Sequence, residues 1–188
     1  MRVAILGATG YTGLVILRLL GEHPEVREII AVSSSRPGEP VRGIDPGVSP
    51  AIEAKLKPAD GRLSQLTEAV RAAEADRLDA VFSCLPHLKS AATCAPFFGK
   101  TVVIDLSADF RLHDSSTFAR AYGEPAPKPE LLGQAVYGLS EWHRDQIRKA
   151  DIIANPGCYP TAALLPLLPL AKEGIIQGTV IVNAISGI

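Results

Sequence analysis

The beginning of the chain combines three segments that together predict one structural unit. Residues 3–6 are a short apolar run, residues 7–13 carry glycines in the spacing G-x-x-G-x-x-G, and residues 14–20 form an apolar helical stretch that ends at Gly21. A continuous apolar run is typical of a buried parallel strand. A strand, a glycine turn and a helix in this order form the context that a phosphate-binding loop requires.

The glycines of this turn have a physical role in such a loop. They let the backbone approach a pyrophosphate, and the helix that follows supplies N–H donors at its N-terminus. We therefore predict that residues 7–13 bind a dinucleotide. The spacing differs from the common G-x-G-x-x-G, so a glycine turn without a ligand stays open as the alternative.

Further apolar segments predict the rest of a sheet. Strands are expected at residues 28–32, 79–84, 101–106 and 152–154, and residues 63–73 have helical spacing of apolar side chains. Alternation of strands and helices predicts an α/β fold, a Rossmann-type doubly wound parallel sheet over residues 1–154. Residues 108–132 contain three closely spaced prolines and are predicted to be irregular, which is typical of a functional segment.

The end of the second predicted strand indicates which dinucleotide binds. An NAD site usually has an acidic residue there, which bonds the ribose 2′-hydroxyl. Here the strand ends in Ser33, Ser34, Ser35 and Arg36. Hydroxyls and a guanidinium can hold a 2′-phosphate, which favours NADP. A solvated arginine at a strand end is the alternative.

Two later strands also end in polar residues. His87 follows the strand at 79–84, and Asp109 and Arg111 follow the strand at 101–106. Ligands bind outside the carboxyl ends of parallel strands, so these residues are candidates for a place beside the cofactor or substrate. For His87, an isolated surface histidine is an equally good interpretation.

Cys158 is the candidate nucleophile. Asn155, Pro156 and Gly157 form a turn sequence, and residues 162–172 predict a helix with Pro160 in its first turn. Cys158 is thus placed at or just before a helix N-terminus, where a thiolate is favoured. A small structural cysteine beside a tight turn is the alternative. Cys84 and Cys94 are predicted to be core residues.

Composition excludes several classes of function. A net charge of −1 and the absence of a basic cluster give no reason to expect nucleic acid or an acidic membrane surface. The most apolar stretch, residues 162–170, is too short to span a bilayer. Three cysteines without a C-x-x-C pair predict neither a disulfide framework nor a metal site. The beginning of the chain lacks a signal peptide, so a cytoplasmic location is expected.

Five motifs, in order along the chain, resemble N-acetyl-gamma-glutamyl-phosphate reductases. They are residues 7–13 (Gly-Ala-Thr-Gly-Tyr-Thr-Gly), 85–87 (Leu-Pro-His), 106–112 (Leu-Ser-Ala-Asp-Phe-Arg-Leu), 137–139 (Tyr-Gly-Leu) and 155–161 (Asn-Pro-Gly-Cys-Tyr-Pro-Thr). The related aminoadipyl-phosphate reductases of lysine biosynthesis share most of these motifs, and aspartate-semialdehyde dehydrogenases match them less well.

The resemblance implies a reaction and a set of site residues. NADPH would reduce an acyl phosphate, N-acetyl-glutamyl 5-phosphate, to the semialdehyde through a thioester on Cys158, a step of arginine biosynthesis. Candidates on the substrate side are His87, Arg111 and Asn155. The residues expected to bind NADP are Gly7, Thr9, Gly10, Tyr11, Thr12, Gly13, Ser34, Ser35, Arg36, Leu85 and Pro86. The resemblance also implies a homo-oligomer for the complete enzyme.

The chain departs from the family's pattern after Cys158. In the family, the histidine that partners the cysteine lies downstream of it, whereas all four histidines here precede Cys158. We therefore interpret residues 155–188 as the nucleophile loop, a helix and the first strand of a truncated catalytic (substrate) domain. We expect little or no reductase activity from the chain alone, and exposed apolar surface near residues 164–170. A nucleotide-binding module without catalysis is the alternative function.

Overall fold

A computed structural model describes residues 1–75 and 77–185. It contains one seven-stranded parallel sheet in the order β3-β2-β1-β4-β5-β7-β6. The strands are β1 (Arg2–Leu6), β2 (Glu28–Val32), β3 (Leu56–Lys57), β4 (Ala80–Ser83), β5 (Val102–Asp105), β6 (Val136–Tyr137) and β7 (Ile152–Ala154). The doubly wound sheet expected from the alternation of strands and helices is therefore confirmed.

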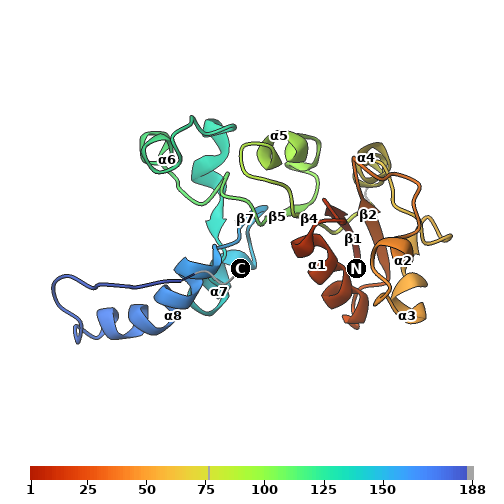
Figure 1. Cartoon of the computed structure of the whole chain (residues 1–188). Helices are drawn as coiled ribbons and strands as arrows, with labels where there is room; N and C mark the ends of the chain where they lie inside the picture. Colours follow the sequence, from red (N-terminus) through yellow and green to blue (C-terminus); the bar gives the residue numbers. More distant parts are fainter. Residues whose placement is uncertain (76, 186–188) are drawn as a thin grey trace.

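Helices cover both faces of the sheet (Figure 1). On one face lie α1 (Tyr11–Glu22), α2 (Val41–Ile44), α3 (Pro50–Glu53), α7 (Ser140–Ile147) and α8 (Cys158–Lys172). On the other lie α4 (Leu66–Glu74), α5 (Ser90–Cys94) and α6 (Ser115–Tyr122). Two 3₁₀ turns, η1 (Ala95–Phe97) and η2 (Pro129–Gln134), complete the second layer.

Each face of the sheet has its own core, because successive side chains of a strand point to opposite faces. In β1, Val3 and Ile5 pack with Leu17 of α1, whereas Ala4 and Leu6 pack with Phe97 of η1. All six side chains are buried. The apolar run in residues 3–6 is therefore continuous because β1 is covered on both faces.

The order of the strands locates the ligand-binding crevice. From β1 the chain continues to β2 and β3 on one side, and then crosses to β4 on the other side. In open parallel sheets, ligands bind at the carboxyl ends of the strands where the order reverses in this way. That position lies between the loops that follow β1 and β4.

Residues 108–132 are more regular than expected. Helix α6 forms within them, because the Asp114 side chain accepts a hydrogen bond from the Thr117 N–H (2.7 Å) and so caps its N-terminus. Gly123 ends the helix with φ of 76°. The prediction of an irregular segment was therefore wrong for residues 115–122.

Helix α8 projects from the sheet, and the chain after it returns alongside (Figure 1). No residue of α8 is buried, and Leu170, Ile175 and Ile181 are exposed, which confirms the expected apolar surface in this region. The expected first strand of a further domain is not formed in residues 173–185, where no neighbouring strand is present to accept its hydrogen bonds. Residues 186–188 lie outside the described residues. No described helix has the length and apolarity needed to cross a membrane.

Candidate active site

A cleft of about 780 Å³ lies at the carboxyl edge of the sheet and contains Cys158. Segments far apart in the sequence meet there: the first turn of α1, the ends of β4 and β5, and the N-terminus of α8. The residues that line the cleft are Thr12, Cys84, Leu85, Leu106, Arg111, Asn155, Pro156, Gly157, Cys158, Thr161 and Ala162.

Cys158 is exposed and is the first residue of α8, as its sequence context predicted. Gly157 is the N-cap residue, no side chain caps the helix, and no acidic residue lies in its first turn. The first N–H groups of a helix have no partner within the helix and favour negative charge beside them. The N-terminus of α8 therefore presents unpaired N–H donors at the cleft, which favour an anionic group there.

The turn that carries Cys158 is fixed to the sheet and to its own helix. The Asn155 N–H donates to the Asp105 carbonyl at the end of β5 (2.8 Å). The Asn155 side-chain amide donates to the Pro156 carbonyl (3.0 Å), and the Thr161 hydroxyl donates to the Gly157 carbonyl (2.9 Å). These bonds order the backbone on both sides of the cysteine.

Arg111 is held beside this turn. Its Nε donates to the Asn155 carbonyl (2.8 Å), and its Nη2 donates to the Leu106 carbonyl (2.8 Å). Its Nη1 makes no hydrogen bond to any described residue and faces Gly157, on which a Cβ atom would lie 3.3 Å from Nη1. The guanidinium therefore offers a positive charge and free donors at the cleft.

Asp109 does not face the cleft, in contrast to Arg111. It is fully buried and accepts hydrogen bonds from the N–H groups of Leu88 (2.6 Å) and Ala91 (2.9 Å). Leu88 has a positive φ of 65°, an uncommon conformation for a leucine. Asp109 therefore holds the loop after β4 in shape, and its role at the site is indirect.

Asp105 is a second buried carboxylate beneath the site. Its oxygens accept hydrogen bonds from the hydroxyls of Ser90 (2.5 Å) and Ser107 (2.6 Å), and Ser90 also contacts Ser83 (2.6 Å). Burial raises the pKa of the Asp105 carboxyl, although the hydrogen bonds from Ser107 and Ser90 act in the opposite direction. This network joins the carboxyl ends of β4 and β5.

Asp105 is expected to make folding stability depend on pH. Because its folded-state pKa is raised above the ordinary value of 3.8, the unfolded chain loses this proton first as the pH rises. The folded protein therefore becomes less stable relative to the unfolded chain as the pH rises above 3.8. The Asp105→Asn variant cannot ionise there, so the stability of the wild type relative to the variant should fall as the pH rises above the ordinary carboxyl pKa of 3.8. Urea unfolding of both proteins measures this, and a difference that is constant or rises with pH would contradict it.

The other two cysteines differ from Cys158. Cys94 is buried, as expected, whereas Cys84 is only partly buried and lines the cleft. Burial raises the pKa of each of these thiols to about 12, with a further contribution from Asp105 at Cys84. Neither thiol is a good nucleophile near neutral pH, because the thiolate is the reactive form.

Iodoacetamide at pH 8 is therefore expected to modify Cys158 selectively. A thiol of pKa 12 is ionised in roughly one molecule in 10⁴ at this pH, and Cys94 is also inaccessible. Peptide mass spectrometry should find Cys158 labelled long before Cys84 and Cys94, which label rapidly only in denaturant. Equal labelling rates for Cys158 and Cys84 in the folded protein would contradict the assignment.

A second cavity of about 660 Å³ adjoins the cleft, and Leu85 lines both. It lies at the carboxyl ends of β1, β2 and β4, where the strand order reverses. None of the described residues that line it is acidic. They are Leu6, Gly7, Val32, Ser33, Ser34, Pro37, Gln65, Leu66, Thr67, Leu85, Pro86, Lys89 and Thr93.

The structure brings together only part of the expected nucleotide-binding set. Gly7, Ser34, Leu85 and Pro86 line the second cavity, and Thr12 lines the cleft. The remaining members, Thr9, Gly10, Tyr11, Gly13, Ser35 and Arg36, line neither. Ser33, named at the end of the second strand but left out of the binding set, lines the cavity as well. Sequence reasoning missed Gln65, Lys89 and Thr93, which come from the loops and helices after other strands.

The loop at residues 7–13 fits a dinucleotide. The first hydrogen bond of α1 runs from Leu14 N to Gly10 O, so the N–H groups of its first turn have no partner within the helix. No side chain caps α1, and no acidic residue lies in its first turn. A Cβ atom on Gly13 would lie 2.2 Å from the Gly7 carbonyl oxygen, so only glycine permits this close packing of helix and loop. The residues present therefore suit a pyrophosphate.

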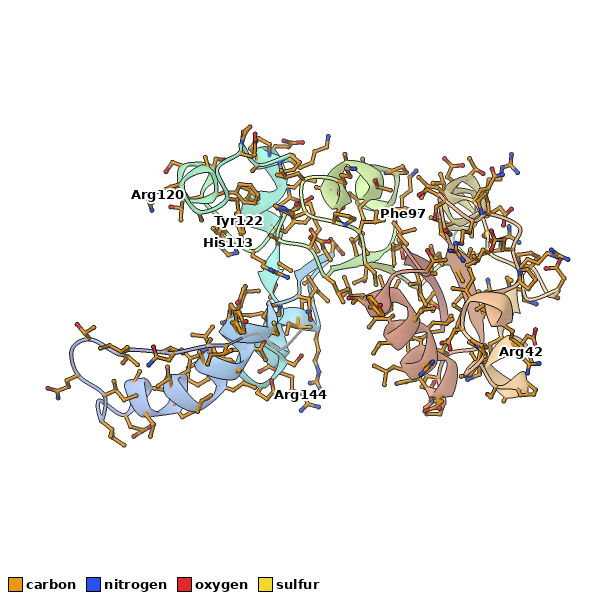
Figure 2. The ribbon with its side chains drawn as sticks, in the orientation of Figure 1. Arg42, Phe97, His113, Arg120, Tyr122 and Arg144 are labelled. Atoms are coloured by element: carbon orange, nitrogen blue, oxygen red, sulfur yellow. The ribbon has the colours of Figure 1, made fainter. Side chains whose placement is uncertain are left out.

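Histidines are not part of the cleft. Among the residues that the structure describes, none of the histidines lines it, and His87 instead lies against Tyr122, with ring centroids 6.2 Å apart. Figure 2 shows His113 in the same part of the molecule as Tyr122, away from α8. In residues 1–75 and 77–185 no group of His, Cys, Asp or Glu side chains is arranged to hold a metal ion.

The structure combines a doubly wound parallel sheet, a glycine loop and a cavity at the switch point of the strand order, and none of the described residues that line this cavity is acidic. These features define a dinucleotide-binding domain. Residues 2–150 match the family described as semialdehyde dehydrogenase, NAD binding domain. The chain belongs to this family.

Relatives and one solved structure agree with this assignment. Along its whole length the chain is 45% identical to an N-acetyl-gamma-glutamyl-phosphate reductase of Geotalea daltonii and 40% identical to one of Rhodopirellula baltica, which confirms the resemblance noted in the motifs. It covers 52% of each, so the chain spans about half the length of the curated relatives it matches. An aspartate semialdehyde dehydrogenase with NADP from Candida albicans has the same fold (TM-score 0.54, 16% identity, 92% of this chain and 47% of that one).

Proposed function

We propose that this protein acts in the NADPH-dependent reduction of N-acetyl-glutamyl 5-phosphate to the semialdehyde, with release of phosphate, through a thioester on Cys158. One observation carries the proposal: Thr12 of the nucleotide loop and Cys158 line the same cleft, which Leu85 joins to the nucleotide cavity. The names of relatives at 40–45% identity support the choice of the glutamyl substrate.

The acyl-transfer step uses residues of this chain. The Cys158 thiolate attacks the carbonyl carbon of the acyl phosphate, a C–S bond forms, and the C–O bond to phosphate breaks with its electron pair leaving on phosphate. The N-terminus of α8 stabilises the thiolate before the attack. Arg111 is placed to hold the phosphoryl oxygens through Nη1, because a guanidinium binds phosphate strongly.

The reduction step requires the nicotinamide dinucleotide, which supplies a hydride when it is bound. The uncapped N-terminus of α1 would hold its pyrophosphate, and Thr12 and Leu85 would lie where the nucleotide cavity opens into the cleft. Once the carbonyl carbon has accepted the hydride, its oxygen carries the negative charge; the C=O bond then re-forms as the C–S bond breaks, and Cys158 leaves as thiolate. Asn155 lies at the same cleft as a further polar contact for substrate.

NADP is proposed in preference to NAD because of the chemistry of the nucleotide cavity. Ser33, Ser34, Thr67 and Thr93 contribute hydroxyl groups to it, and no acidic residue among the described ones is present to bond a free ribose diol. These features support a cofactor with a 2′-phosphate.

Two measurements on the purified chain test the proposal separately. Titration calorimetry should detect NADPH binding with a micromolar Kd and much weaker NADH binding. Incubation with N-acetyl-glutamyl 5-phosphate should release phosphate and add one acyl group to Cys158, detected by intact mass and by its absence in Cys158→Ala. Binding of neither nucleotide, or acylation that persists in Cys158→Ala, would overturn the proposal.

A further inference from the structure

The loop after β4, residues 84–89, forms the boundary between the nucleotide cavity and the cleft that contains Cys158. Leu85 lines both of them. The loop also lies directly against the glycine loop. A Cβ atom on Gly7 would lie 3.0 Å from the Cys84 carbonyl oxygen and 3.2 Å from Leu85 Cδ2, so only the lack of a side chain there permits this approach. The position of the loop after β4 therefore affects the shape of both sites.

The same loop contains a backbone conformation that leucine rarely adopts. Leu88 has φ of 65°, in the left-handed region, where the Cβ atom of an L-residue crowds its own backbone. Among the residues that the structure describes, no other residue except glycine has a positive φ. Such a conformation persists only where the surrounding structure fixes it. The loop after β4 therefore depends on groups outside itself.

Asp109 fixes Leu88 from the loop that follows β5. One carboxylate oxygen accepts a hydrogen bond from the Leu88 N–H (2.6 Å), and the other accepts one from the Ala91 N–H at the start of α5 (2.9 Å). Asp109 is fully buried, and its own N–H donates to the Ser107 hydroxyl (3.1 Å), which donates to Asp105 (2.6 Å). Two acceptor oxygens on one side chain are a property of a carboxylate, because an amide has only one.

We propose that Asp109 is a positioning residue for the nucleotide site, although it lines neither cavity. It holds Leu88 in the left-handed conformation and thereby sets the position of Leu85, the wall between cofactor and nucleophile. This inference rests on the proposed function, in which NADPH occupies the cavity beside Leu85. Arg111 holds the Cys158 turn independently of Asp109, so the loss of the Asp109 carboxylate should leave that turn in place.

The first test is Asp109→Asn, which keeps the size of the side chain but leaves one of the two N–H groups facing an amide NH₂. Titration calorimetry should find NADPH binding weakened by about tenfold or more, because a buried hydrogen bond to a charged group is lost. Without nucleotide, the rate of Cys158 alkylation by iodoacetamide should stay within about twofold of the wild type. Asp145→Asn, in which the replaced side chain is 92% exposed on α7, is the control for charge and should change neither.

A second substitution distinguishes positioning from general support of the fold. Glycine adopts a positive φ without the steric cost that leucine has. In the Asp109→Asn background, Leu88→Gly should therefore restore NADPH affinity by about fivefold or more, and Leu88→Gly alone should leave it within about twofold. Unaltered NADPH affinity in Asp109→Asn, or no recovery on adding Leu88→Gly, overturns the inference. So does a change in Cys158 alkylation as large as the change in affinity. Circular dichroism verifies that each variant is folded.

Hydrogen exchange in the wild type tests the same inference without a variant. The Leu88 and Ala91 amides should be protected in the free protein as strongly as the amides of β4, and addition of NADPH should change their exchange little. Rapid exchange of both amides in the free protein overturns the inference. Protected amides in a protein that binds no nicotinamide dinucleotide would support the fixation of this loop by Asp109 and overturn the proposed function.

Discussion

Replacement of Cys158 by serine should lower reductase turnover by a factor on the order of 10³ or more, as loss of the nucleophile does in other covalent catalysts. Serine has nearly the same size, but at neutral pH its hydroxyl is not ionised by the helix N-terminus that favours a thiolate. Because the chain covers about half of its relatives' length, turnover is measured in a chimera in which it replaces the matching half of the Geotalea daltonii reductase. Oxidation of NADPH is followed by absorbance.

Cys84→Ser is the matched control for this experiment. Cys84 lines the same cleft, but burial raises its pKa to about 12, so it should not act as a nucleophile. The control chimera should keep turnover within a few-fold of the parent, and it should still be acylated at Cys158. Turnover that survives in Cys158→Ser but is lost in Cys84→Ser would show that the nucleophile has been misassigned.

Gly13→Ala should either detach α1 from the sheet or shift α1 enough to abolish cofactor binding. The added Cβ atom would lie 2.2 Å from the Gly7 carbonyl oxygen and 2.8 Å from Ala8 Cα. Both are backbone atoms, so no side chain can move to make room. We expect a loss of stability of about 3 kcal/mol or more, at the upper end of overpacking effects. Urea unfolding and NADPH titration measure the two consequences.

Gly43→Ala is the control for the same substitution in a helix. Gly43 lies in α2 and is exposed, and a Cβ atom built on it would meet no atom within 4 Å apart from its chain neighbours and the backbone of its own helix. Alanine is the better helix former, so stability should be unchanged or rise by up to about 1 kcal/mol. A Gly13→Ala variant as stable as Gly43→Ala would show that α1 does not depend on close contact with the loop.

Much of this fold follows from patterns of apolar residues. A strand that is buried on both faces is largely apolar, so an apolar run predicts its position. Strands β2 and β7 have the predicted bounds, and β1 begins one residue earlier than predicted. The N-terminal position of Cys158 in α8 followed from the turn before it and from Pro160. Strand β6 was missed because two residues carry no periodic signal.

The arrangement of the candidate site was harder to predict. Lys89 and Ser34 line one cavity only because β4 and β2 flank β1 in the sheet, a fact of topology that local patterns do not contain. The carboxylate of Asp109 differs from expectation for a related reason. A polar residue at a strand end can line the cleft, as Arg111 does, or cap a neighbouring turn, as Asp109 does, and the outcome depends on the loop packed against it.

The order of strands also sets an order of assembly during synthesis, in which a chain folds from its N-terminal end first. The nucleotide cavity uses residues only up to Thr93, so its walls exist before Cys158 has been made. Strand β6 is synthesised before β7, yet it joins the sheet through β7, which itself pairs with β5. Docking of β7 therefore completes the edge of the sheet and brings in the Cys158 turn in one event. The nucleotide cavity is therefore made of residues that are synthesised before Cys158, whereas the cleft that contains Cys158 is completed only by the Cys158 turn itself.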